Sequence, residues 1–363
     1  MRMWPIWSAS ITRVVMLRSD FPKIPHTLLL PLLVLLFSAC GTLSGERLDS
    51  DFDVPEWQSE LLQDHPLVGR IWQHRSQQFI SAQSLSRSLA GGEILLLGEK
   101  HDNPDHHALR LALLEQVHRQ RRVSLIAMEM LTEAQQARVD ALQIDAGLTS
   151  DGRALAGLRD QLEWDDGWHW EFYAPLLEFA LKASDLELRS ANIDRDTLSA
   201  VYRGELPPSV SAALVGALTG VQRDSLAEDI DTSHCGLLPD SQFESMVRVQ
   251  QVRDHTMAQA LLVDGRASRN AENASATASD GLRVLVAGNY HVRRDLGVPN
   301  YLPPGLRSET DGVITVAFLE VVEGRLDPAD YQQQLSGLPA WDYIWFTPAL
   351  TDEDYCERMA GGT

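Results

Sequence analysis

Two Gly-x-x-His motifs, at residues 98–101 and 288–291, each follow a run of aliphatic residues. The glycine allows the chain to turn sharply, and a neutral imidazole binds transition metals and haem iron. Glu99, beside His101, could be a third ligand, a general base or a group that orients a ligand. A single loop histidine usually does no chemistry, so the repetition with His291 is what predicts a shared site.

Two further polar side chains follow predicted strands between these motifs. Glu129 ends one strand and Asn192 another. Helices are expected to begin after Asn103 and after His291, and their positive N-terminal ends would favour an anionic group. These positions extend the predicted site across several strand ends.

Basic residues and a second histidine pair are additional candidates. Arg293 and Arg294 follow the second motif, and paired guanidinium groups suit carboxylates. The alternative for these arginines is a structural salt bridge, for example with Asp295. His107, next to His106, is a further candidate contact for a cofactor, with simple solvent exposure as the alternative.

The elements that must position these residues are short aliphatic strands alternating with amphipathic helices. Helices are expected with Pro104 as a first helical residue, from about residue 133, over 175–182 and over 241–262. This alternation predicts an α/β fold, with a mostly parallel sheet and helices on both faces. Sites in such sheets form at the carboxyl ends of the strands. The strands are expected at residues 94–97, 123–128, 186–191, 282–287, 313–321 and 343–346.

The N-terminus has the layout of a bacterial lipoprotein signal. Basic residues precede an apolar run, and Ser38 and Ala39 precede Cys40. We expect a signal peptide over residues 1–39, lipidation of Cys40, and a tether over 40–60. The alternative is a plain cleaved signal with a chance cysteine.

The remaining chain is expected to form one α/β domain over residues 61–350 and a C-terminal tail over 351–363. Residues 205–240, rich in acids, predict a helical, lid-like insertion. Residues 264–281 have almost no large apolar side chains and predict a flexible loop.

Charge and cysteine content exclude some functions. The formal net charge of the 363-residue chain is −20, which disfavours a nucleic-acid partner. Beyond Cys40 only Cys235 and Cys356 remain, and the sequence leaves open whether they pair or stay free thiols. No CxxC motif is present, so a zinc site built on cysteine is not expected.

Several segments together resemble the ChaN group of iron-regulated, haem-binding lipoproteins, in the haem-binding uptake, Tiki-like superfamily. The resemblance covers about residues 94–346. It implies an α/β domain that binds haem as a homodimer and serves iron acquisition at the outer membrane of a Gram-negative bacterium, with a haem-uptake receptor as a further partner. The segments are LLLGEKHDNPDHH, the WxWxFY element at 168–173, LRSANI, SHCGLLPD, RDHTMAQAL and AGNYHVRRDLGVPNYL.

The resemblance leaves the chemistry of the site open. In a haem-binding protein, His101, His291 or a tyrosine such as Tyr290 would bind the iron, and Arg293 or Arg294 would pair with the propionates. In a metal-dependent hydrolase related to Tiki proteases and erythromycin esterases, Glu99, His101 and His291 would hold a divalent transition metal. Glu129, or Glu99 itself, would then act as the base. A structural envelope lipoprotein is the third possibility.

Overall fold

The computed structural model describes residues 52–148, 157–183, 185–263, 281–307, 312–335, 337–353 and 356. The predicted signal peptide (1–39), Cys40 and nearly all of the predicted loop 264–281 lie outside these residues. None of the described helices has the length and apolar character that crossing a membrane requires.

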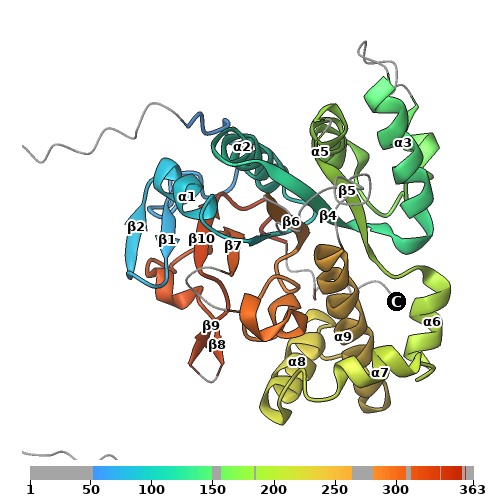
Figure 1. Ribbon diagram of the computed structural model, residues 1–363. Helices are drawn as coiled ribbons and strands as arrows, with labels where there is room; N and C mark the ends of the chain where they lie inside the picture. The colour runs from blue at the N-terminus through green and yellow to red at the C-terminus, as the bar shows by residue number, and fades with distance from the viewer. Residues whose placement is uncertain are drawn as a thin grey trace, which may run out of the picture. The chain divides into compact units, whose positions relative to one another are not determined.

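An eight-stranded sheet in the order β2-β1-β10-β7-β3-β6-β4-β5 forms the centre of the fold (Figure 1). The six strands from β10 to β5 run parallel, and β1 and β2 add an antiparallel edge. The strands are β1 (Ile71–Gln73), β2 (Gln78–Ile80), β3 (Ile94–Glu99), β4 (Val123–Thr132), β5 (Glu187–Asn192), β6 (Leu282–Gly288), β7 (Val313–Glu320) and β10 (Tyr343–Thr347). A separate hairpin pairs β8 (Gln334–Leu335) with β9 (Leu338–Pro339). The predicted α/β fold with a mostly parallel sheet is confirmed.

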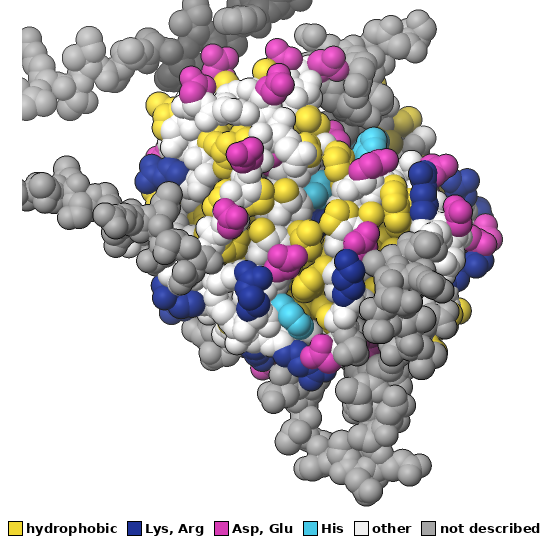
Figure 2. All heavy atoms as spheres, turned by 90° about the horizontal axis from the view of Figure 1, so that it is seen from above, with side chains coloured by type: hydrophobic (Ala, Val, Ile, Leu, Met, Phe, Trp, Pro, Cys, Tyr) yellow, Lys and Arg dark blue, Asp and Glu magenta, His cyan; other side chains and the backbone are white. Residues whose placement is uncertain are grey.

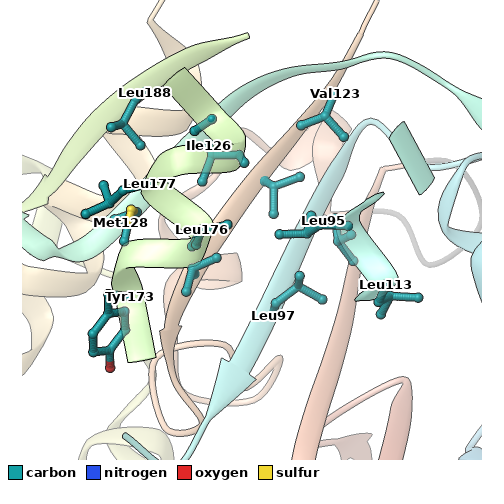
Figure 3. Packing of buried hydrophobic residues seen from close by; sticks show 14 of the residues in the cluster. Leu95, Leu97, Leu113, Val123, Ile126, Met128, Tyr173, Leu176, Leu177 and Leu188 are labelled. Atoms are coloured by element: carbon teal, nitrogen blue, oxygen red, sulfur yellow. The ribbon is translucent and has the colours of Figure 1, made fainter. Parts of the chain in front are cut away.

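Alternate residues of each strand point to opposite faces of the sheet, and both faces are buried. In β3, Leu95 and Leu97 belong to one apolar core, and Ile94 and Leu96 belong to the other. Figure 3 shows the first core, where Leu95 and Leu97 lie among side chains of α2 and α5 such as Leu113. Continuous aliphatic runs therefore mark strands that are covered on both sides.

Helices cover the two faces as the sequence predicted (Figure 1). The first core is covered by α1 (Ala82–Leu89), α2 (Pro104–Gln120), α3 (Gln136–Leu148), α4 (Leu158–Leu162) and α5 (Trp170–Lys182), with η1 (Glu133–Gln135) before α3. The second core is covered mainly by α9 (Asp240–Leu262) and η3 (Val298–Tyr301), followed by η4 (Pro304–Leu306). The other elements are α6 (Arg195–Tyr202), α7 (Pro208–Leu214), α8 (Gly220–Ser233) and η5 (Pro328–Asp330).

The turn into α2 forms as its sequence predicts. Asn103 is the N-cap, and its side-chain oxygen accepts a hydrogen bond of 2.9 Å from the backbone N–H of Asp105. Pro104 occupies the first helical turn, where its missing N–H costs nothing.

The helix predicted after His291 does not form, and that prediction is wrong. The chain instead closes a compact loop, in which the backbone N–H of Val298 donates to the carbonyl of His291 at 2.8 Å. Gly297 permits this closure, because a Cβ at its position would lie 2.1 Å from the carbonyl oxygen of His291. Only the short η3 follows, from Val298.

Helices α7 and α8 lie in the segment predicted as a helical insertion, residues 205–240. Leu226 and Ile230 of α8 pack in a small apolar cluster with Val247 of α9. Just beyond α8, Cys235 forms a disulfide with Cys356, which the sequence alone had left open. The segment after α8 is therefore covalently fixed to the C-terminal region.

Candidate functional site

The two Gly-x-x-His motifs lie side by side because β3 and β6 are neighbours in the sheet. In their parallel register Glu99 is opposite Gly288. Strand β6 comes late in the chain but sits between β3 and β4, so connections leave the sheet in opposite directions here. Such a switch point opens a crevice at the carboxyl ends of the strands.

His101 lies at the base of this crevice, edge-on to Trp168 with ring centroids 4.8 Å apart. Its Nδ1 is 3.3 Å from the hydroxyl of Tyr173, and its Nε2 is 3.8 Å from Oε2 of Glu129. Burial lowers the pKa of His101, so the imidazole is neutral near pH 7. A Cβ on Gly288 would come within 2.8 Å of Nε2, which therefore faces the strand end.

His291 is held between two acids. Its Nδ1 is 2.6 Å from Oδ1 of Asp254 and its Nε2 is 3.4 Å from Oε1 of Glu129. Burial alone would lower the pKa of His291, but the charges of Glu129 and Asp254 outweigh burial and raise it to about 9. His291 is therefore an imidazolium at neutral pH when no ligand is bound.

Glu129 connects these groups at the end of β4. Its Oε2 accepts the backbone N–H of Gly288 at 2.8 Å, and its Oε1 pairs with Arg253 of α9. Although burial raises the pKa of Glu129, His291 and Arg253 hold it well below 4.5. Asn192 supports the group by donating to the carbonyl of Glu129 at 3.0 Å. A carboxylate stabilised in this way is a weak base, which argues against the predicted catalytic role.

Glu99 does not face a shared metal position either. It is buried, pairs with Arg110 of α2 and accepts a hydrogen bond of 2.7 Å from Tyr173. Within the described ranges, no group of three His, Cys, Asp or Glu side chains is arranged to hold a metal ion. The structure brings Glu99, His101 and His291 together at the strand ends, but not around one point.

A cleft of about 770 Å³ lies over these strand ends, and its volume is within the size range of cofactor sites. Helices α8 and α9 form one side of it, and the ends of β3, β6 and β7 form the base. The apolar lining consists of Leu226, Ile230, Met246, Val249, Phe318, Leu319 and Trp341.

The polar lining contains groups that could contact a ligand. Tyr290 is 48% exposed at the cleft, and burial raises the pKa of its phenol. His234 lines the cleft from the end of α8. Lys100 and Arg325 supply positive charge, and Lys100 is bound to Glu320 at 3.0 Å. Among the described residues, no ion pair to Arg325 is found.

Arg293 and Arg294 do not reach the cleft, contrary to the prediction that they would meet carboxylates of a ligand. Arg293 is buried and forms bonds of 2.8 and 2.7 Å with Asp295 and one of 2.7 Å with Asp229. Arg294 is buried against Asp342, at 2.6 Å. These arginines form the structural salt bridges that the sequence offered as the alternative.

His107 also belongs to the core rather than the cleft lining. It stacks on Phe172 with ring centroids 4.8 Å apart, and its Nε2 is 3.0 Å from the carbonyl of His101. Burial lowers the pKa of His107 to about 4. His106 is equally buried, so solvent exposure of this pair is excluded as well.

Several residues of the site were not predicted, among them Asp254, Arg110, Tyr173 and His234. Asp254, His234 and Tyr173 stood in the quoted segments RDHTMAQAL, SHCGLLPD and 168–173, so a signal was present. Arg110 lies outside these segments. It could still have been detected, because a charged side chain on the apolar face of a helix is unusual.

The open, mostly parallel sheet, with a histidine-containing cleft at its switch point, defines the chain as an α/β protein. Residues 85–302 match the family described as "Haem-binding uptake, Tiki superfamily, ChaN". The chain belongs to this family, as its sequence segments indicated.

One solved structure agrees with the fold. The structure titled "Cofacial heme binding to ChaN of Campylobacter jejuni" is 22% identical, with a TM-score of 0.56, over 76% of this chain and 95% of that chain. An erythromycin esterase mutant, EreC, in its open conformation is 13% identical, with a TM-score of 0.40, over 76% and 95% of the two chains. No curated protein sequence matches this chain.

Proposed function

We propose that this chain binds haem in the cleft at the ends of β3, β6 and β7, as cargo in haem or iron acquisition. The observation that carries the proposal is the 770 Å³ cleft, which combines an apolar wall with histidine and tyrosine side chains. A porphyrin is flat and largely apolar, so burying its faces against aliphatic and aromatic side chains is favourable. Membership of the haem-binding family supports the same ligand.

Arg325 replaces Arg293 and Arg294 as the proposed partner of the haem propionates. The acids that line the cleft are largely neutralised within the protein: Glu129 by Arg253 and Asp229 by Arg293. The acidic surface, visible as scattered Asp and Glu side chains in Figure 2, therefore does not exclude an anionic ligand from the cleft. Arg325 is exposed at the cleft edge and available to pair with a carboxylate.

The protonation states of the side chains that line the cleft favour ligand binding over hydrolysis. Glu129 is paired and strongly acidic, and His291 is protonated, so neither suits the role of a base at neutral pH. Hydrolysis that depends on a divalent metal also lacks a ligand set within the described ranges.

We further propose that the protein is a lipid-anchored homodimer of the Gram-negative outer membrane, which exchanges haem with an uptake receptor. The lipoprotein signal before Cys40 supports the anchor. Exposed apolar side chains near cleft-lining residues support the dimer: Tyr290 lines the cleft itself, and Leu326 follows Arg325. A second copy would cover these side chains.

Titration of the purified full chain with ferric haem tests the proposal. A saturable change in the Soret band near one haem per chain is expected. Arg325→Ala should weaken binding about tenfold, or about 1.4 kcal/mol, whereas Arg75→Ala, an exposed arginine outside the cleft lining, should not. The absence of any Soret change at micromolar haem would overturn haem binding, and metal analysis with esterase assays would then test the hydrolase alternative.

Membrane fractionation tests the anchor separately. Cys40→Ser should move the protein from the membrane fraction to the soluble fraction and abolish incorporation of labelled fatty acid. Unchanged labelling in this variant would contradict lipidation at Cys40.

A further inference from the structure

The end of the predicted tether is fixed to the α/β domain. The backbone N–H groups of Gln58 and Ser59 donate to the carboxylate of Asp105 at 2.7 and 3.0 Å. Asp105 lies in the first turn of α2 and is 1% exposed, so water does not compete for these hydrogen bonds. Two residues further on, Leu61 forms an antiparallel bridge with Ala349, just beyond the end of β10. Figure 1 shows this first described segment, in dark blue, beside α2.

This attachment point lies beside the cleft. The N-cap of α2, Asn103, donates to the carboxylate of Glu320, which lines the cleft, at 2.7 Å. Ring contacts make a second connection: the ring centroid of Phe52 is 5.6 Å from that of Trp345, which is 6.0 Å from that of Phe318 in the cleft lining. The chain therefore enters the domain at the carboxyl edge of the sheet, the same edge that holds the cleft.

The chain between this attachment point and the predicted lipid anchor is short. Residues 41–51, 11 in number, separate Cys40 from Phe52. Fully extended, 11 residues reach about 40 Å, whereas a compact domain of about 300 residues is roughly 50 Å across. To turn the opposite edge of the domain toward the bilayer, these residues would have to stretch almost to their limit, which costs chain entropy. A tether of this length therefore favours the orientation in which the cleft edge is nearest to the membrane.

The surface at the attachment point does not itself attract a bilayer. Residues 52–69 contain four exposed acids and neither lysine nor arginine. Anionic headgroups repel such a segment. The orientation is therefore set by the tether rather than by adsorption, and a gap remains between the cleft edge and the bilayer. The exposed acids are Asp53, Glu56, Glu60 and Asp64.

We propose that the anchored protein holds its cleft toward the bilayer, and that haem enters and leaves through the gap between the domain and the membrane. The proposal rests on the proposed lipid anchor and haem binding, and names the direction from which the ligand arrives. The partner that fits this geometry is a haem-carrying protein embedded in the same membrane. A soluble partner on the far side of the domain would meet the amino edge of the sheet instead.

Energy transfer from a fluorophore on the domain to acceptor lipids tests the orientation. The lipidated full chain, in vesicles of neutral lipid, is labelled either at Leu326→Cys, which is 61% exposed at the cleft side, or at Glu93→Cys, exposed at the amino end of β3. Cys235 and Cys356 are paired and do not take the label. Strand β3 alone spans about 20 Å, so transfer from Leu326→Cys should be about twofold more efficient or better. In the matched control, about 40 Gly and Ser residues inserted after Ser50 should make the two positions equivalent.

Haem uptake tests the proposed route of exchange. Ferric haem dissolved in the bilayer of the same vesicles should reach the anchored wild type about threefold faster or more than it reaches the long-tether variant, because a longer tether lowers the effective concentration of the cleft at the membrane. Equal rates would overturn exchange through the gap.

The outcomes separate this proposal from the proposed function. Equal transfer from both labels with the native tether, or stronger transfer from Glu93→Cys, would overturn the orientation. A preference that requires anionic lipid, or that survives the long tether, would overturn the tether as its cause and assign the orientation to adsorption. The energy-transfer measurement contains no haem, so a failure of haem binding leaves its result standing. If wild type and Cys40→Ser both fail to float with vesicles, the anchor and the orientation are overturned together.

Discussion

The acid–histidine–acid arrangement at the base of the cleft should make the stability of the protein fall in alkaline solution. In the folded protein His291 titrates at about 9, compared with 6.5 for an unperturbed histidine. The folded state therefore binds its proton more tightly than the unfolded state between these two values. This contribution to stability is fully present below pH 6.5 and is lost as the pH rises through 9.

The magnitude follows from the displacement of the pKa. At 1.36 kcal/mol per pH unit, a change from 6.5 to about 9 corresponds to about 3 kcal/mol of unfolding free energy. His291 is almost fully buried, so solvent screening reduces this value little. A loss of about 3 kcal/mol is a large fraction of the roughly 5–15 kcal/mol that stabilises a typical domain.

Urea unfolding at several pH values between 6 and 9.5 measures this effect. Asp254→Asn removes one of the two charges and keeps the shape of the side chain, so the pKa of His291 should fall and the alkaline loss should shrink. Asp224→Asn, on the exposed face of α8, is the matched control and should follow the wild type. Parallel curves for wild type and Asp254→Asn across this range would refute the reasoning.

Three further predictions concern stability. Gly288→Ala places a Cβ 2.8 Å from Nε2 of His101, so the ring must shift, and calorimetry should show a loss of about 1–3 kcal/mol; an unchanged melting temperature would contradict this close packing. Reduction, or the paired substitution Cys235→Ser with Cys356→Ser, removes a cross-link between residues that are 121 apart in sequence. The free energy of unfolding in urea should fall by about 2–4 kcal/mol. An unchanged free energy of unfolding would show that the cross-link does not constrain the unfolded chain. His107, whose folded pKa is about 4, should destabilise the protein by about 3 kcal/mol as the pH falls from 6.5 to 4, and His107→Gln should flatten that slope in the same assay.

The strands could be predicted because they are buried on both faces. Continuous runs such as Ile94–Leu97 and Leu282–Ala287 mark this situation, and the observed β3 and β6 extend them by only a residue or two. The hairpin β1–β2 was missed because each strand has only three residues and is only partly buried. Neither hydrophobic periodicity nor residue composition therefore indicates a strand there.

The candidate site could be predicted in location but not in the role of each residue. Equivalent glycines at the ends of two strands placed His101 beside His291, since parallel neighbours end at the same edge. The partners that determine their charge, such as Asp254 and Arg253, come from α9, and no local pattern reports which strand end a helix will cover. The roles predicted for Arg293 and Arg294 failed because both side chains pair within the protein. Asp295, a partner of Arg293, was visible in the sequence, whereas Asp229 and Asp342 are distant in sequence.

The position of β6 has a consequence for how this chain folds. Strands β3 and β4 are consecutive in the sequence, yet β6 separates them in the sheet and enters only after helices α3 to α9 have been traversed. Until residues 282–288 arrive, two long apolar strands present unpaired edges, which template aggregation. Assembly of the central sheet is therefore a late, non-local event, and such topologies fold slowly. Chains that end before residue 282 should accumulate as aggregates rather than as soluble intermediates, so the binding cleft can form only once the chain is nearly complete.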